Sequence, residues 1–123
     1  MVTASSQISA LSALVEHVRH NPDWVVIVAP PGGGAQELQK ALTVVRPPDA
    51  AMGGRTLLMP SGGRVTVCGL SHPVDGEGYL VLTMGFDREL SPRNEIALHV
   101  WRQKSKGTVL VGEQPGELRI IRK

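Results

Sequence analysis

The sequence predicts an α/β fold in which a small mixed, mostly parallel sheet is flanked by helices. Two apolar runs of strand length, Trp24–Val28 and Tyr79–Met84, indicate buried central strands. Segments with a helical spacing of apolar residues alternate with these runs, and a glycine-rich turn joins the first run to the next helix. Such an alternation favours helices layered on a sheet, with a P-loop-like start. A chain of 123 residues is expected to form one domain over 1–123.

The first part of the chain is expected to form a helix, a strand, a turn and a second helix. Apolar residues recur every three or four positions from Ile8 to Val18, which predicts a helix that ends before Pro22. The apolar strand then leads into the turn 29–34, Ala-Pro-Pro-Gly-Gly-Gly. The helix-forming residues Ala, Gln, Glu, Leu and Lys dominate the segment after it, so a second helix is expected there, ending near Val44.

The middle of the chain carries a hairpin signal before the second apolar run. Two short strand-like segments, 55–59 and 64–69, are joined by Pro-Ser-Gly-Gly at 60–63. The small residues of 49–54 are interpreted as a loop. Because parallel and hairpin pairings both occur, the sheet is expected to be mixed, with about three to five strands.

The last part of the chain predicts a helix and two strands. Ser91 is the expected N-cap of a helix over about 92–104, since proline follows it at the first helical position, and Gly107 is the expected stop. Residues 108–111 predict a buried strand, and residues 118–121 predict an edge strand.

Composition and charge limit the classes of function. Hydrophobic residues make up 41% and charged residues 20% of the chain, which is typical of a globular protein. The net charge of +2 does not by itself indicate nucleic-acid binding, and aromatic residues, at 3%, offer few platforms for base stacking. The single cysteine, Cys68, excludes an internal disulfide, and its apolar neighbours indicate a buried thiol. No leader peptide or membrane span is evident, so a cytoplasmic protein without a membrane partner is expected.

The glycine turn carries the main functional motif. A phosphate-binding P-loop has the pattern G-x-x-x-x-G-K-[ST], in which Lys contacts the outer phosphates and the hydroxyl holds magnesium. Aligned with this pattern, the chain keeps Gly34 but has Ala29, Ala35 and Gln36 at the other defining positions. Two interpretations stay open: the amides of the glycines bind an anion at the helix start, or the glycines only make a tight turn. The candidate phosphate-binding residues are Gly32, Gly33 and Gly34.

Residues 24–112 resemble a shrunken, degenerate P-loop NTPase domain. The order of strand, glycine loop, helix, hairpin, apolar strand, helix and strand is similar to the ATPase core of viral large terminases, which are DNA-packaging motors. In that family the second apolar strand ends in Asp-Glu, which holds magnesium and supplies the catalytic base, whereas here Asp87 and Glu89 follow at a displaced position. Thr108–Val111 and the segment 112–116 resemble the next strand and its coupling loop.

The resemblance implies magnesium-dependent ATP hydrolysis in a viral or nucleic-acid-handling assembly, but the replaced residues argue against catalysis. Phosphoryl transfer depends almost wholly on positioning and electrostatic stabilisation. Losing one stabilising group typically slows an enzyme by roughly a hundred- to a thousandfold. With Ala35 in place of the Lys and Gln36 in place of the hydroxyl, negligible hydrolysis is expected. We therefore expect no catalytic residue and no cofactor beyond a weakly bound nucleotide or anion.

Other polar residues offer no recognisable metal or catalytic pattern. His17 and His20 are three residues apart but have no third ligand nearby, so surface or helix-end positions are expected. A polar loop and the residues after the second apolar strand contain carboxylates that could meet but are expected to be solvated, together with a loop histidine. These residues are His72, Asp75, Glu77, Asp87 and Glu89.

Basic residues gather near the C-terminus and form the second candidate site. If the end of the last helix lies beside the final strand, their charges make a patch suited to a phosphate backbone. The alternative is a solvated surface with cations placed favourably at a helix C-terminus. The candidate residues are Arg102, Lys104, Lys106, Arg119, Arg122 and Lys123.

Three functional hypotheses follow from these patterns. The leading one is a non-catalytic, P-loop-like binding module that acts through a protein partner or nucleic acid. The second is a nucleotide-binding ATPase subunit whose missing groups come from a neighbouring chain in an oligomer. The third is a protein that binds the nucleic-acid backbone through the C-terminal basic patch.

Overall fold

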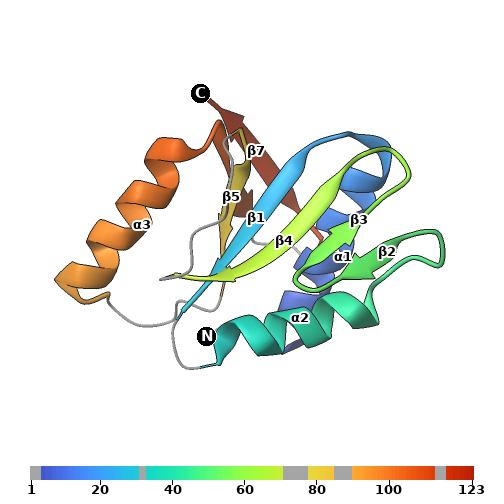
Figure 1. The fold of residues 1–123 in the computed structure, drawn as a ribbon, viewed down its shortest axis with the longest axis horizontal. Coiled ribbons are helices and arrows are strands. Elements are labelled where there is room, and N and C mark those ends of the chain that lie inside the picture. The colour runs from blue at the N-terminus through green and yellow to red at the C-terminus, as the bar shows by residue number, and fades with distance from the viewer. Residues whose placement is uncertain (1–3, 31–32, 71–77, 85–89, 113–115) are drawn as a thin grey trace.

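The computed structural model describes residues 4–30, 33–70, 78–84, 90–112 and 116–123, and these ranges form three helices and seven strands. Figure 1 shows the helices flanking a twisted sheet, which confirms the predicted α/β class. In chain order the elements are α1 (Ala4–His20), β1 (Trp24–Ala29), α2 (Gly34–Val44), β2 (Ala51–Gly53), β3 (Thr56–Leu58), β4 (Arg64–Gly69), β5 (Leu80–Thr83), α3 (Pro92–Lys104), β6 (Gly107–Val111) and β7 (Leu118–Arg122).

The sheet has the strand order β2-β3-β4-β1-β5-β6-β7 and is parallel in its middle. Strands β4, β1, β5 and β6 run parallel to one another, while β2, β3 and β7 are antiparallel to their neighbours at the two flanks. Strand β1 lies between β4 and β5, so that Val26 is in register with Thr66 on one side and Val81 on the other. Buried on both faces, β1 has a continuous apolar sequence and no polar alternation.

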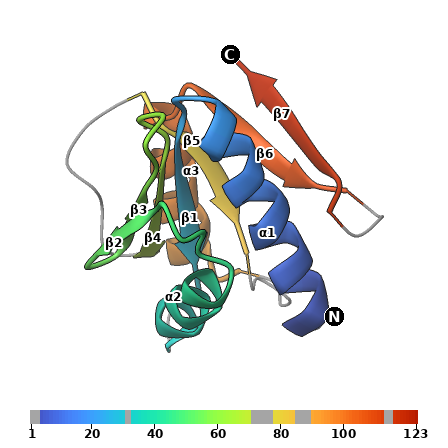
Figure 2. The same cartoon turned by 90° about the vertical axis from the view of Figure 1, so that its right-hand side faces the viewer.

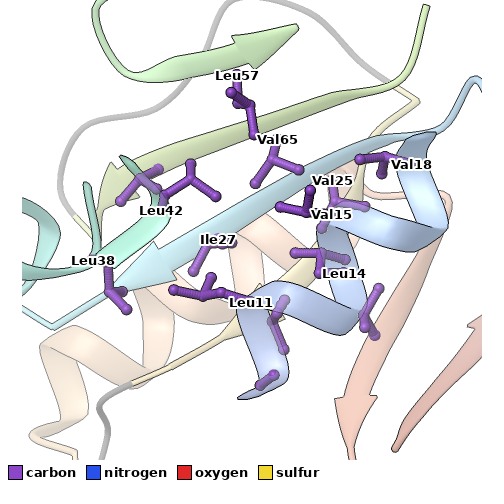
Figure 3. Packing of buried hydrophobic residues seen from close by; sticks show 14 of the residues in the cluster. Leu11, Leu14, Val15, Val18, Val25, Ile27, Leu38, Leu42, Leu57 and Val65 are labelled. Atoms are coloured by element: carbon purple, nitrogen blue, oxygen red, sulfur yellow. The ribbon is translucent and has the colours of Figure 1, made fainter. Parts of the chain in front are cut away.

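One face of the sheet is covered by α1 and α2. Leu11 and Leu14 of α1 and Leu42 of α2 are fully buried against Ile27 and Val65 of the sheet. Figure 3 shows these side chains converging between the two helices and the strands. The apolar stripe predicted for the first helix therefore faces the larger of the two cores.

The opposite face is covered by α3, as the turned view in Figure 2 shows. Leu98 and Trp101 of this helix pack on the β1 and β5 side chains. The Trp101 indole N–H donates to the Leu70 carbonyl at 2.9 Å, and the Tyr79 hydroxyl donates to the Trp101 carbonyl at 3.2 Å. The Tyr79 ring meets both Trp24 and Trp101 edge-on, with centroids 5.6 and 5.7 Å apart. This smaller core thus contains most of the chain's aromatic side chains.

The predicted N-cap of α3 is confirmed in its geometry. The Ser91 side chain accepts a hydrogen bond from the Asn94 backbone N–H at 3.3 Å, and Pro92 occupies the first helical position. The predicted hairpin is also confirmed, because β3 and β4 pair antiparallel. Cys68 is buried, as its apolar neighbours indicated.

Three expectations are corrected. The sheet has seven strands within the described residues, more than expected, partly because Ala51–Gly53, interpreted as a loop, forms β2. Gly54, with a φ of +57°, makes the two-residue turn that folds β2 back on β3. Gly107 is the first residue of β6 and not the helix stop, because α3 already ends at Lys104 with Ser105 as its C-cap. Glycine fits this strand position because a Cβ there would lie 2.5 Å from the Ile121 carbonyl oxygen. Strand β6 is only partly buried, with Leu110 44% exposed.

Candidate functional site

The turn between β1 and α2 lies at the carboxyl end of the central strand. Strands β4 and β5 hold this end from both sides, because the Leu70 N–H donates to the Ala29 carbonyl at 3.0 Å and the Met84 N–H donates to the Val28 carbonyl at 3.2 Å. The chain then turns and enters α2 at Gly34. Gly32, one of the three candidate glycines, lies outside the described residues.

The two described glycines have conformational roles of their own. Gly33 is the N-cap of α2 and has a φ of +93°, a left-handed conformation that favours glycine. A Cβ on Gly34 would lie only 3.1 Å from the Pro30 ring, so the proline packs closely on the first residue of the helix. Gly33 has no side chain with which to cap the N-terminus of α2. The strand, glycine turn and helix predicted from the sequence are therefore present, with the first-turn N–H groups lacking a side-chain acceptor at the N-cap.

The side chains after the glycines do not offer phosphate chemistry. Ala35 is partly buried and packs against the larger core, so the position that carries the lysine of a P-loop is part of the packing here. Gln36 is exposed on the first turn and has no hydroxyl for a metal ion. Backbone N–H groups are thus the donors that this turn presents to an anion.

The connections that follow β1 and β5 leave the carboxyl end of the sheet on opposite faces. After β1 the chain leads through α2 on one face toward β4, whereas after β5 it leads through α3 on the opposite face to β6. The connections that leave the neighbouring strands β1 and β5 therefore diverge. In open α/β sheets, ligands bind in the crevice outside the carboxyl ends of strands at such a switch point.

The other acidic and histidine candidates are not brought together in the described structure. His72, Asp75, Glu77, Asp87 and Glu89 all lie outside the described residues. Within the described ranges, no group of three or more His, Cys, Asp or Glu side chains could hold a metal ion. His17 and His20 bond to different carboxylates, Asp23 and Glu16, each at 2.9 Å.

Five of the six C-terminal basic residues lie toward the amino ends of the parallel strands. Arg102 and Lys104 end α3, Lys106 precedes β6, and Arg122 is in register with Gly107 at the start of β6. The Lys123 ammonium donates to the Arg102 and Gln103 carbonyls at 2.7 and 3.1 Å, which ties the chain end to α3. The end of the last helix therefore lies beside the end of the final strand, which is the condition under which these residues could form one patch.

Arg119 is separate from this group. It is in register with Leu110, three residues along β7 from Arg122, so the two arginine side chains leave the strand on opposite faces. The other five basic residues lie at the end of the sheet opposite to the glycine turn, because the turn follows the carboxyl end of β1. The two candidate sites therefore cannot act on one phosphate group together.

Arg122 and Lys106 surround the buried carboxylate of Asp23, a residue that the sequence pattern did not single out. Asp23, 8% exposed, lies between α1 and β1. Arg122 donates to its two oxygens at 3.4 and 2.9 Å, His17 contacts it at 2.9 Å, and the Lys106 ammonium lies 3.6 Å away. The Arg122 hydrogen bond, opposed by burial and assisted by the His17 hydrogen bond, lowers the pKa of Asp23 from 3.8 to about 2. Asp23 therefore stays ionised in the folded protein and joins α1, β1, β6 and β7.

A further cation was missed because its partner is distant in the sequence. The Arg64 guanidinium lies over the Trp24 ring, 4.3 Å from the ring centroid, at the start of β4 and β1. The Trp24 indole N–H donates to the Thr66 hydroxyl at 2.9 Å. Parallel pairing of β1 with β4 places Trp24 beside Arg64. The apolar sequences of the two segments indicate strands, but they do not tell that these strands are neighbours.

No described helix is both long enough and apolar enough to cross a membrane. Comparison with known proteins leaves the geometry as the sole guide to function, since no family model, curated protein or solved structure matches the chain.

Proposed function

We propose that this chain is a non-catalytic, P-loop-like binding module that acts through a macromolecular partner. The observation that carries the proposal is the turn between β1 and α2. It lies at the switch point of the sheet and presents helix N-terminal N–H groups, but Ala35 packs on the core where a catalytic lysine would be needed. Binding of an anionic group without hydrolysis is the chemistry that such a turn supports.

Titration of the isotopically labelled chain by nuclear magnetic resonance tests the turn directly. Inorganic phosphate and ATP are added with and without magnesium, and the amide signals of Gly34, Ala35 and Gln36 are followed. We expect saturable shifts at millimolar ligand that do not require magnesium, because Gln36 stands where a P-loop has the hydroxyl that holds the ion. Unmoved signals would show that the glycines only make a turn.

A pair of charge variants separates binding at the turn from a general charge effect. Gln36→Glu places a carboxylate on the first turn and is expected to weaken anion binding. Lys40→Gln changes the net charge by the same amount one turn further along the exposed side of α2 and is expected to have little effect. Equal effects of both variants would argue against a site at the turn.

An ATPase assay on the same samples tests the absence of catalysis. We expect no magnesium-dependent release of phosphate above the buffer rate. Robust hydrolysis by the isolated chain would overturn the proposal. Hydrolysis that rises steeply with protein concentration would instead favour an ATPase subunit completed by a neighbouring copy.

A second candidate function is binding of a nucleic-acid backbone at the amino end of the sheet. It is supported by the clustering of basic residues there, of which Arg102 and Lys104 are exposed and do not contribute to the Asp23 cluster. The double variant Arg102→Gln, Lys104→Gln is expected to weaken salt-dependent binding of a DNA duplex. The matched control is Lys40→Gln, Arg46→Gln on and after α2. Equal binding by both double variants would reject this surface.

A further inference from the structure

Strand β7 ends the sheet and presents its outer backbone groups to solvent. The Lys123 N–H donates to the Lys106 carbonyl at 3.0 Å, and the Gly112 N–H donates to the Glu117 carbonyl at 2.8 Å. Antiparallel pairing alternates along a strand, so the backbone groups of residues 119 and 121 also point toward β6. Those of Leu118, Ile120 and Arg122 point away from the sheet. Within the described ranges, no backbone group bonds to them.

Apolar side chains flank this edge on both faces of the sheet. Ile121 is 50% exposed, and its neighbour across the face, Leu110, is 44% exposed. On the other face Leu118 and Ile120 are partly buried against the larger core, while Val111 is 46% exposed. Figure 2 shows β7 at the outer side of the sheet, next to β6. An added strand would therefore gain apolar cover on either face.

The charges at this edge select the sign of a partner. Arg119 is exposed in the middle of β7, whereas the Arg122 and Lys123 side chains at its end bind Asp23 and the α3 carbonyls. A second copy of β7 would bring the two Arg119 side chains toward each other across the new pairing, which is unfavourable. Basic residues on an edge strand discourage unselective pairing, but a strand with carboxylates meets them favourably. The other sheet edge, β2, has only three residues and is a poorer template.

We propose that the free edge of β7 binds an extended acidic segment of a partner protein, which adds to the sheet as a further strand. Backbone hydrogen bonds to Leu118, Ile120 and Arg122 supply the pairing, and Arg119 supplies the preference for acidic residues. The proposal names a partner for the binding module proposed above and in that sense rests on it. The β7 edge and the glycine turn are nevertheless separate places on the sheet, so either can fail alone.

The test uses the full chain, isotopically labelled, and a short capped peptide of alternating Glu and Val. One control peptide has Lys in place of Glu, and a second acidic control has Pro in place of Val, which removes every second backbone N–H and disfavours pairing as a strand. We expect the acidic strand-forming peptide alone to shift the amides of Leu118, Ile120 and Arg122 in a saturable way. The amides of the glycine turn are recorded in the same spectra, with phosphate added separately.

Two variants separate strand addition from simple charge attraction. Ile120→Pro removes one outward N–H without touching a bond to β6 and is expected to weaken peptide binding at least about tenfold, with Ile120→Val as its control. Arg119→Glu is expected to reverse the preference toward the Lys-containing peptide. Arg93→Glu, the same charge change on exposed α3, is expected to leave the preference unchanged.

The outcomes decide between distinct explanations. Acidic-peptide binding that survives Ile120→Pro, or that Arg119→Glu does not affect, would overturn the proposal. The proposal would also be overturned if a single-stranded oligonucleotide shifts the β7 amides while the acidic peptide does not, because the edge would then bind a nucleic acid. Response of the β7 amides to peptide, with no response of the turn to phosphate, would support this proposal while refuting the anion site. Since Ile120→Pro could disturb folding, its urea midpoint is measured, and Arg119→Glu tests the surface independently.

Discussion

Replacing the buried carboxylate of Asp23 with an amide should destabilise the fold in a pH-dependent way. The Asp23→Asn variant removes the negative charge that Arg122, His17 and Lys106 surround but keeps the size of the side chain. Because Asp23 joins α1 and β1 to the β6–β7 pair, the loss is expected to affect global unfolding as well as the C-terminal strand.

The pKa of Asp23 sets the size of this effect. The folded-state pKa is lowered from 3.8 to about 2, and the Asp23 side chain is only 11% exposed. Each unit of pKa difference corresponds to about 1.4 kcal/mol, so ionisation of Asp23 stabilises the folded state by about 2 kcal/mol at neutral pH. The folded pKa is below the unfolded one, so this contribution is complete above 3.8 and is lost as the pH falls toward 2.

Urea unfolding of the wild type and of Asp23→Asn, followed by tryptophan fluorescence, measures the difference. At pH 7 the variant is expected to be about 2 kcal/mol less stable, and the gap should close as both proteins are taken to low pH. Asp49→Asn is the matched control, because Asp49 pairs with Arg19 at 3.6 Å on the surface and its side chain is 45% exposed. The Asp49→Asn control should lower the free energy of unfolding by only about 0–1 kcal/mol.

Two results would refute the reasoning about Asp23. Equal losses for Asp23→Asn and Asp49→Asn would show that burial adds nothing to the ion pair. A loss at pH 7 that persists unchanged at low pH would show that it comes from packing and not from charge. A double-mutant cycle with Arg122→Gln checks the partner, and a coupling near zero would exclude Arg122 as the main stabilising group.

Three further predictions concern the packing around the sheet. Gly63→Ala should lower the free energy of unfolding by about 1–3 kcal/mol, because its Cβ would overlap a carbonyl oxygen of α1. The control is Gly53→Ala, whose Cβ meets nothing within 4 Å, and equal urea midpoints of the two variants would contradict the prediction. Trp101→Phe leaves the buried carbonyl of Leu70 without its donor, so the free energy of unfolding measured in urea should fall by about 1–3 kcal/mol. An unchanged urea midpoint would show that another donor replaces the indole. Burial raises the pKa of the Cys68 thiol, so a disulfide reagent at mildly alkaline pH should modify Cys68 only as fast as the protein unfolds locally. Rapid modification in the folded chain would disprove the burial of Cys68.

Much of the architecture could be predicted from local patterns. The continuous apolar sequence of β1 indicated a strand buried on both faces, and Ser91 with Pro92 marked the start of α3. The glycine turn was evident because Gly33 and Gly34 sit where a strand gives way to helix-forming residues. Strand β2 was missed, since three small residues have little strand preference of their own and are held by pairing with β3.

The candidate sites depended more on long-range contacts. The sequence left open whether the C-terminal cations cluster, and the role of Arg122 at Asp23 could not be predicted, because the two residues are 99 positions apart. The outward-facing groups of β7 follow from its register with β6 and from its place in the strand order. No local pattern of Leu118–Arg122 tells which backbone groups remain unpaired.

The sequence by itself determined the three helices and most of the strands, β2 excepted, and it determined that the turn before Ala35 lacks the side chains of a phosphate-transfer site. These properties depend on neighbouring residues through side-chain periodicity, capping and backbone freedom. Only the tertiary structure decided the strand order, the separation of the glycine turn from the basic residues, and the use of Arg122 to neutralise a buried carboxylate. Those features depend on contacts between residues far apart in the chain, whose free energies appear only when the sheet has assembled.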